Sequence, residues 1–146
     1  MTLTDDELRG LVGYAFPGGH YRVAHWENWL LTDCTGADPL PDAIVHPVAL
    51  FHAPILGSRT SIAELFALFH AEGAGSVGLL GYDWEYFGPL REDIDYRCEG
   101  GILEAQRYVD DNGRISDEIA FRIELLEDGR LAARITNRWR FRRSPT

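Results

Sequence analysis

The residues with the clearest chemical potential in this 146-residue chain gather around His46, which precedes Pro47 and an apolar run ending at residue 52. Proline suits the first position of a helix, because its fixed φ fits and its missing N–H is not needed there. The pattern therefore predicts a buried helix beginning at Pro47 with His46 at its cap. The first N–H groups of a helix lack helical partners, so this position can bind a carbonyl oxygen or an anion.

Short elements are expected before this helix. Residues 5–12 indicate a short helix, residues 20–25 a short strand and residues 26–33 an apolar helix. Residues 35–43 are rich in Gly, Pro and Asp, which is typical of a loop. This loop leads directly into His46 and carries Asp38 and Asp42.

The chain after Pro47 also carries clear helix signals. Pro54 cannot lie deep in a regular helix, so we expect a kink or break there. Thr60 or Ser61 begins a further helix through about residue 71, with Glu64 placed for a capping box after Ser61.

From Gly75 onward, apolar and polar residues alternate as they do in strands. Strands are expected over residues 80–86, 94–109, 119–125 and 133–142, with a possible break at Gly100 and Gly101. Turns are expected at residues 111–113 and 128–129. Helices followed by antiparallel strands predict an α+β fold, and the length favours one domain spanning residues 1–146.

Composition excludes several classes of function. The net charge of −9 disfavours nucleic acid and anionic membranes as partners. No apolar run approaches the roughly 20 residues of a membrane span, and the acidic start lacks the features of a signal peptide. Cys34 and Cys98 are far apart and show no metal or redox spacing. We therefore expect a cytoplasmic protein with two free thiols and no metal or cofactor.

All fourteen basic residues are arginines, and five of them are clustered near the C-terminus. The group consists of Arg134, Arg138, Arg140, Arg142 and Arg143. Such a cluster can bind phosphates. The alternative is a solvated face of a strand.

The chain resembles the hot-dog superfamily and, within it, the MaoC-like enoyl-thioester hydratases and dehydratases. The resemblance covers about residues 21–143. Residues 43–47 (Ala-Ile-Val-His-Pro) are similar to the family's start of the central helix, and residues 89–93 (Pro-Leu-Arg-Glu-Asp) to its Pro-(Val/Leu)-Arg-x-Gly-Asp strand end. The resemblance implies a hot-dog fold, an antiparallel sheet wrapped around a central helix. It also implies an acyl thioester of coenzyme A or acyl carrier protein as substrate.

The family's Gly-Asp-x-Asn-Pro-x-His motif is incomplete in residues 36–43. If Asp38 takes the place of the family aspartate, Ala43 stands where the histidine belongs. If Gly36 is aligned strictly, Asp42 stands there and Ala37 replaces the aspartate. Hydration of an enoyl thioester needs an acid, a base and donors aimed at the enolate oxygen. The usual Asp-His pair is therefore missing.

His46 is the best replacement, because Asp38 and Asp42 are close in sequence and a carboxylate can orient a histidine ring and raise its basicity. We thus take His46, Asp38 and Asp42 as candidate catalytic residues, with a purely structural cap as the alternative for His46. The candidate substrate-binding residues are Pro47, Val48, His52, Tyr82, Trp84 and Tyr86. For His52 a buried structural role, and for the aromatic stripe a place in the core, are the alternatives.

Three functions remain open: a hydratase or dehydratase of acyl thioesters, a hot-dog thioesterase, and a non-catalytic binding or structural subunit. Hot-dog thioesterases resembling this chain use a carboxylate on or near the central helix, yet residues 47–59 contain no Asp or Glu. A sheet of this kind leaves edge strands, and the pocket of the family lies between subunits. We therefore expect a homodimer or a dimer of dimers.

Overall fold

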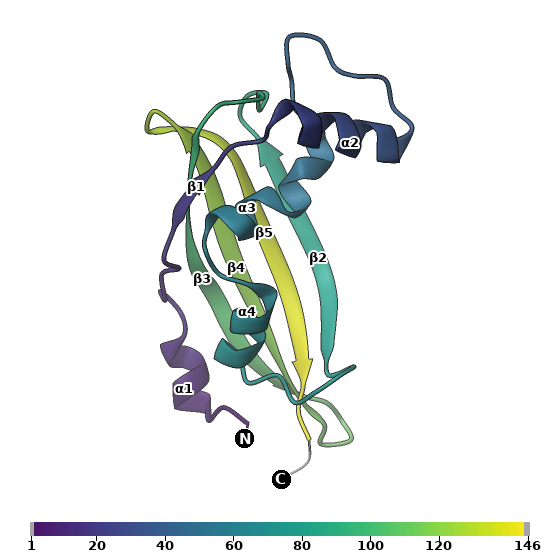
Figure 1. The fold of residues 1–146 in the computed structure, drawn as a ribbon. Helices are drawn as coiled ribbons and strands as arrows, with labels where there is room; N and C mark the ends of the chain where they lie inside the picture. Colours follow the sequence, from purple (N-terminus) through teal and green to yellow (C-terminus); the bar gives the residue numbers. More distant parts are fainter. Residues whose placement is uncertain (1, 145–146) are drawn as a thin grey trace.

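The computed structural model describes residues 2–144, which form one antiparallel sheet with helices packed against one of its faces (Figure 1). The sheet order is β1-β3-β4-β5-β2. The strands are β1 (Gly19–Tyr21), β2 (Val77–Tyr86), β3 (Tyr96–Val109), β4 (Ile115–Glu127) and β5 (Arg130–Arg142). The helices are α1 (Asp5–Gly10), α2 (His25–Thr35), the 3-10 helix η1 (Pro47–Phe51), α3 (Ala53–Gly57) and α4 (Ile62–Leu68). The expected α+β class is confirmed.

The strand pattern follows from side-chain alternation. On β4 and β5 every second residue is buried against the helices, and the others face outward. The inward-facing apolar set on these strands consists of Ile119, Phe121, Ile123, Leu125, Ala133, Ile135, Trp139 and Phe141, and Ala120 and Ala132 between them are also buried. The turn between the two strands has φ of 48° at Asp128 and 76° at Gly129. Positive φ at both central residues suits a two-residue hairpin, which explains why Asp-Gly stands there.

The expected break at Gly100 and Gly101 is wrong, because β3 runs through both residues. Both positions are glycine because the backbone of another segment passes too close to leave room for a side chain. A Cβ on Gly100 would lie 2.2 Å from the carbonyl oxygen of Arg122, and one on Gly101 would lie 2.3 Å from that of Tyr14. Gly100 thus lets β4 approach closely, and Gly101 lets the segment around Tyr14 cross over the strand, where Phe16 N–H donates to the Gly100 carbonyl.

The helix expected from Pro47 is shorter than the sequence suggested. It consists of one 3-10 stretch, η1, and one short α-helix, α3, separated at His52. Pro54 lies in the first turn of α3, where proline is tolerated, so the expected break is confirmed. Ala49, Leu50 and Ala53 are completely buried, and Figure 1 shows this segment lying across the inner face of the sheet.

Helix α4 has the expected capping box, in which the Ser61 hydroxyl accepts from Glu64 N–H and the Glu64 carboxylate accepts from Ser61 N–H. It ends at Leu68, not near residue 71. His70 has a left-handed φ of 52°, which stops the helix. The buried Arg143 guanidinium donates to the carbonyls of Phe69 and His70 and so ties the end of β5 to this helix end.

The two edges of the sheet differ. β1 contributes only three residues to one edge, whereas β2 offers ten along the other. Large apolar side chains on β2 are exposed, from 36% at Trp84 to 59% at Leu79. Helix α2 lies above the end of this edge and projects beyond it in Figure 1. Trp26 and Trp29 on that helix are also exposed.

Candidate functional site

His46 caps the 3-10 helix with its ring. Nδ1 accepts the N–H of Val48 at 3.1 Å, and Nε2 lies 3.3 Å from Oγ1 of Thr35. The Thr35 hydroxyl donates to the carbonyl of Thr32 at 2.8 Å, so it accepts from the imidazole. A neutral imidazole that accepts at Nδ1 carries its proton on Nε2. The ring therefore occupies the free backbone N–H of Val48, a group of the kind that we expected to bind a substrate oxygen. In its place the ring presents its own Nε2–H beside the exposed Thr35.

A buried asparagine positions this histidine. Oδ1 of Asn28 accepts the backbone N–H of His46 at 2.8 Å, while its Nδ2 donates to the Ile44 carbonyl and to Oε1 of Glu92. The other Glu92 oxygen lies 2.9 Å from Nδ1 of His25. The Asn28 hydrogen bond, and then the contact with His25, lower the pKa of Glu92. Helix α2 is thereby joined to the start of η1 and to the segment after β2.

Neither loop aspartate is hydrogen-bonded to His46. Asp38 and Asp42 are exposed, and neither forms a hydrogen bond or ion pair with any residue between 2 and 144. Asp42 and Ala43 have φ of 57° and 56°, which is uncommon for residues other than glycine. The loop therefore approaches the cap through an irregular turn, and a catalytic role for either aspartate stays a prediction.

A histidine–carboxylate pair does exist, at the other end of η1. Nε2 of His52 lies 2.7 Å from Oε1 of Glu27, which also accepts the Tyr21 hydroxyl proton at 2.6 Å. The Glu27 side chain is 14% exposed and that of His52 27%. Burial, and then the bond to Glu27, raise the pKa of Tyr21, so its phenol stays a donor. An imidazole hydrogen-bonded to a carboxylate is an arrangement that can transfer a proton to or from a bound ligand.

Glu27 and Tyr21 were not expected at a functional site from the sequence. Glu27 lies 25 residues before its partner, on a different helix, and no local spacing connects the two. The one available signal was an acidic residue in the first turn of an otherwise apolar helix. An acidic residue in this position is normally explained by the favourable interaction of its negative charge with the helix dipole.

Aromatic side chains of β2 border η1 on its free side. The sheet register places Tyr82, Trp84 and Tyr86 on the inner face, yet they remain 36–40% exposed. The Tyr86 hydroxyl donates to the Pro47 carbonyl at 2.6 Å, and the ring of Phe51 lies 6.0 Å from that of Tyr82. Burial raises the pKa of Tyr86. These rings form an open apolar wall, so they are not the closed core that the alternative interpretation required.

Most of the C-terminal arginines have carboxylate partners on the outer face of the sheet. Arg134 pairs with Glu85 and Glu124, Arg138 with Glu104, Arg140 with Glu118, and Arg143 with the buried Asp117. Among these five arginines, Arg142 has no carboxylate partner within residues 2–144. The cluster is thus mainly a charge-paired strand face, as the alternative interpretation held.

Known structures resemble this one. No family model and no curated protein matches the chain. In the ChsH1-ChsH2 complex from Mycobacterium tuberculosis, one chain aligns with a TM-score of 0.71 at 10% identity, over 97% of this chain and 92% of that one. The HadBC (3R-hydroxyacyl-ACP dehydratase) complex from the same organism aligns with a TM-score of 0.63 at 10% identity, over 88% and 96%. A MaoC-like dehydratase aligns with 0.68 at 12%, over 92% and 43%.

The chain has the hot-dog fold of the MaoC-like dehydratases. At these identities the likeness establishes the fold, and the activity has to be argued from the site. Within residues 2–144 no helix is long and apolar enough to cross a membrane. No three side chains of the metal-binding types gather in this part of the chain.

Proposed function

We propose that this hot-dog protein binds an acyl thioester of coenzyme A or acyl carrier protein and interconverts its enoyl and 3-hydroxyacyl forms. The observation that carries the proposal is the pair of histidines on the broken central helix. His46 offers an Nε2–H at the helix start, and His52 is paired with a carboxylate. Hydration of an enoyl thioester requires such proton-transferring groups and a donor to the enolate oxygen.

His46 is the first candidate for contact with the substrate. Its Nε2–H faces only the hydroxyl of the exposed Thr35, at a long 3.3 Å, which a thioester oxygen can replace. The neutral ring is held by Val48 N–H on its other side, so the donor is already oriented. Asp38 and Asp42 contribute only if the loop of residues 36–43 closes towards the ring when substrate binds.

The acyl chain is assigned to the surface beside η1. Pro47 and Val48 form the start of that helix, and Tyr82, Trp84 and Tyr86 face it from β2. Their partly exposed rings offer apolar area that an acyl group can cover. His52 lies at the other end of η1 from His46 and is the second candidate for proton transfer.

The same surface favours self-association, and we propose a homodimer or a dimer of dimers. β2 is a long, apolar edge strand, and such edges pair with another chain unless they are covered. In an isologous dimer the β2 edges of two copies pair with each other. Light scattering at micromolar concentration tests this, and a monomer there would contradict it.

The direct test of the activity is an assay of the purified protein with crotonyl and 3-hydroxyacyl thioesters over a range of pH. The wild type should add water to the enoyl thioester and remove it from the hydroxyacyl thioester. His46→Ala and Glu27→Gln should be assayed beside it, with Glu99→Gln, an exposed carboxylate of β3, as the matched control. Turnover of neither substrate by the wild type would contradict the proposal and favour a non-catalytic binding subunit.

A thioesterase is the second candidate, and one observation favours it. Although η1 and α3 contain no acid, Glu27 reaches His52 at the junction of the two helices. A carboxylate beside the central helix can act as the base that directs water at the thioester carbonyl. Release of free thiol from a saturated acyl thioester, abolished in Glu27→Gln, would support hydrolysis over hydration.

A further inference from the structure

Two polar side chains on the inner face of β5 are buried without a partner. Asn137 is 1% exposed and Trp139 3%, and neither Oδ1 of Asn137 nor Nε1 of Trp139 forms a hydrogen bond with any residue between 2 and 144. In the sheet register they lie opposite Phe121 and Ile119 of β4, so both point into the apolar layer beneath the helices. Buried polar groups in proteins are almost always hydrogen-bonded, because an unpaired one loses its bonds to water without compensation. These two atoms therefore indicate a partner that is not part of the chain.

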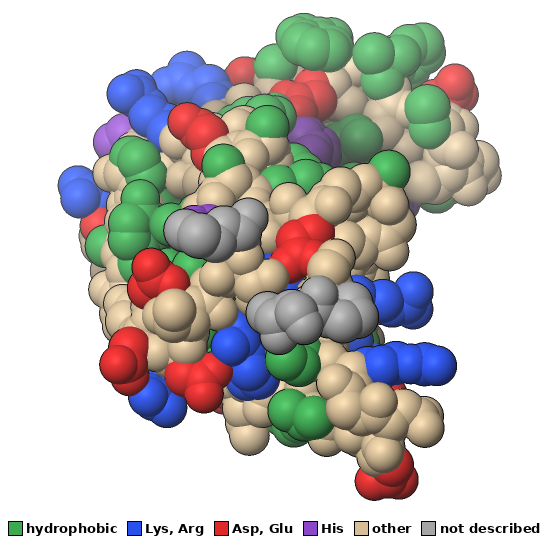
Figure 2. Space-filling view, turned by 90° about the horizontal axis from the view of Figure 1, so that it is seen from below, with side chains coloured by type: hydrophobic (Ala, Val, Ile, Leu, Met, Phe, Trp, Pro, Cys, Tyr) green, Lys and Arg blue, Asp and Glu red, His purple; other side chains and the backbone are tan. Residues whose placement is uncertain are grey.

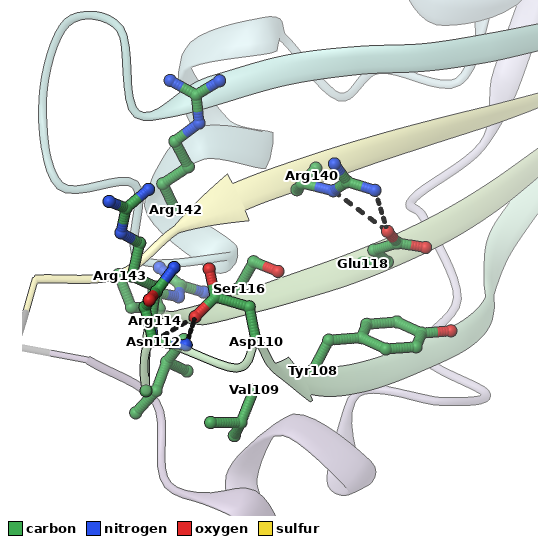
Figure 3. A pocket seen from close by; sticks show the side chains of 12 residues that line it. Tyr108, Val109, Asp110, Asn112, Arg114, Ser116, Glu118, Arg140, Arg142 and Arg143 are labelled. Atoms are coloured by element: carbon green, nitrogen blue, oxygen red, sulfur yellow. Dashed lines mark hydrogen bonds and ion pairs between the residues drawn. The ribbon is translucent and has the colours of Figure 1, made fainter.

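Polar side chains on the outer face of the same strand have partners. Arg138 donates to Glu104 and Arg140 to Glu118, and Figure 3 shows the second pair beside an open pocket. Figure 2, seen from the end of the sheet that carries both termini, shows arginine side chains projecting from one side of the molecule. Groups on the outside can bond to carboxylates or to water. The unpaired atoms of β5 that point inward have neither, so the charge pairs of the outer face do not explain them.

Only the edge strand β2 separates the two atoms from the surface. Tyr82 of β2 lies beside Asn137 and Leu79 lies beside Trp139, and these β2 side chains are 38% and 59% exposed. The register shifts between Leu79 and Gly81, so a β-bulge lies between the two positions. Bulges are common beside active sites, where they redirect a side chain or interrupt the pairing. A ligand on the inner face of β2 can therefore reach both atoms by displacing the Tyr82 ring.

The same strand connects this place with the start of η1. Tyr86 donates to the Pro47 carbonyl, and the ring of Tyr82 lies 6.0 Å from that of Phe51. The two tyrosines are four residues apart on β2, which corresponds to about 13 Å. An acyl group whose thioester lies at His46 therefore needs a long chain to bring its far end beneath the rings of Phe51 and Tyr82.

The two unpaired atoms are chemically complementary. The amide oxygen of Asn137 only accepts hydrogen bonds, and the indole N–H of Trp139 only donates. Residues two apart on a strand share a face and lie about 7 Å from each other, and an oxygen with two hydrogen bonds of about 2.9 Å spans roughly 6 Å. A single hydroxyl can therefore donate to one and accept from the other. A carbonyl or ether oxygen would only accept, and a carboxylate would bring an unpaired charge into the apolar layer.

We propose that Asn137 and Trp139 form a subsite for a hydroxyl group at the far end of a long acyl chain, and that they select such hydroxylated substrates over plain ones. The rings of Phe51 and Tyr82, both partly exposed, move apart to admit the chain. This rests on the proposed function for the thioester end. Within that function it assigns the substrate class, an acyl thioester whose long chain ends in a hydroxyl group.

The first test measures binding without turnover. S-dodecyl pantetheine and S-(ω-hydroxydodecyl) pantetheine are thioethers, so they can be neither hydrated nor hydrolysed, and calorimetry gives their affinities for the intact protein. The wild type should bind the hydroxylated compound roughly 10-fold more tightly, the effect of about one net hydrogen bond. Asn137→Leu and Trp139→Phe, which each remove the polar atom and keep an apolar side chain, should abolish this preference. Arg138→Gln, on the outer face between the two residues, should retain it. Equal binding of both compounds by the wild type would overturn the proposal.

The second test asks whether a trapped water is the permanent partner of the two atoms. Urea denaturation of the free protein compares the wild type with Asn137→Leu. If Asn137 has no partner before a ligand binds, the leucine variant loses an unsatisfied buried oxygen, so its denaturation midpoint should be at least as high as that of the wild type. A clearly lower midpoint would mean that an internal water already satisfies both atoms, which would contradict the proposal.

The subsite and the proposed activity can be tested apart. If the wild type turns over no enoyl thioester but prefers the hydroxylated thioether, the activity fails and the subsite stands. If the wild type hydrates a crotonyl thioester but binds the two thioethers equally, the activity stands and the subsite fails. A crotonyl group is too short to reach from His46 to Asn137, so its turnover should not respond to Asn137→Leu.

Discussion

The two ends of the sheet each hold a carboxylate between cationic or proton-donating groups, but the groups differ in kind. Asp117 is fully buried and accepts from Arg107 and Arg143. Glu27 is partly exposed and accepts from Tyr21 and His52. Both partners of Asp117 are arginines, whose guanidinium groups only donate hydrogen bonds and carry a fixed positive charge in proteins. The partners of Glu27 are a phenol and an imidazole, two groups that can exchange a proton with a bound ligand.

Burial and the choice of partners distinguish a charge cluster that stabilises the fold from one that can take part in chemistry. The Asp117 cluster joins the end of β5, the β3–β4 ladder and the end of α4, and the side chains of Asp117 and Arg143 within it are completely buried. The histidine end combines partial exposure with neighbouring apolar surface. Four substitutions test this contrast.

Asp117→Ala should give the largest change in stability. It leaves the guanidinium of Arg143 buried without its carboxylate, which typically costs about 3–5 kcal/mol in the free energy of unfolding. Urea denaturation measures the loss. Glu118→Gln, the neighbouring carboxylate on the outer face, should cost less than about 1 kcal/mol. Equal losses in the two variants would mean that burial does not distinguish the clusters.

His46→Ala should act on chemistry more than on stability. Turnover of enoyl thioester should fall roughly 10²–10⁴-fold, the usual contribution of a positioned acid or base. The free energy of unfolding should fall by only about 1 kcal/mol, as for a lost helix cap. Asp38→Asn should reduce turnover less, if Asp38 only orients the ring. Full activity in His46→Ala would transfer the chemical role to His52 and Glu27.

Tyr21→Phe probes whether the Glu27 trio is more than a structural contact. Removing the Tyr21 hydroxyl should lower the free energy of unfolding by about 1 kcal/mol, because one hydrogen bond to the partly buried Glu27 carboxylate is lost. If His52 and Glu27 transfer a proton, turnover should also fall, because Glu27 then has one donor fewer to hold it beside His52. A change in the denaturation midpoint with unchanged turnover would make the trio structural.

The smallest expected effect concerns Glu92, whose pKa is lowered by Asn28 and His25. A carboxyl with a lowered folded-state pKa stabilises the fold above its unfolded pKa, about 4.3, and loses that contribution as pH falls through the folded-state value. The stability difference between wild type and Glu92→Gln should therefore be constant near neutrality and shrink below about pH 4. A difference that grew with acid would contradict the assigned direction.

Local patterns predicted most of the secondary structure. Alternation located the four long strands, Asp128-Gly129 located a hairpin, and the Ser61 to Glu64 spacing located a capping box. These signals are local, because each depends on side-chain period or on φ at one or two residues. Gly100 and Gly101 misled the prediction, since they serve close approaches, Gly100 to the neighbouring strand at Arg122 and Gly101 to Tyr14, a residue more than eighty positions away in the chain.

The candidate site was predicted less completely. His46 was expected at a helix cap and is found there. Its partners were expected to be loop aspartates but are Asn28, Val48 and Thr35. A cap depends on neighbours two or three residues away, whereas the choice of Asn28 depends on how α2 packs over the start of η1.

The sequence by itself determined the α+β class, the long strands with their turns, the proline break and the place of His46, because dihedral preferences and side-chain periodicity act within a few residues. Only the tertiary structure decided which charged groups meet. Glu27 with His52 and Asp117 with Arg143 are each brought together from more than twenty residues apart. Their pairing energy depends on distance and burial, and both quantities exist only once the helices are packed on the sheet.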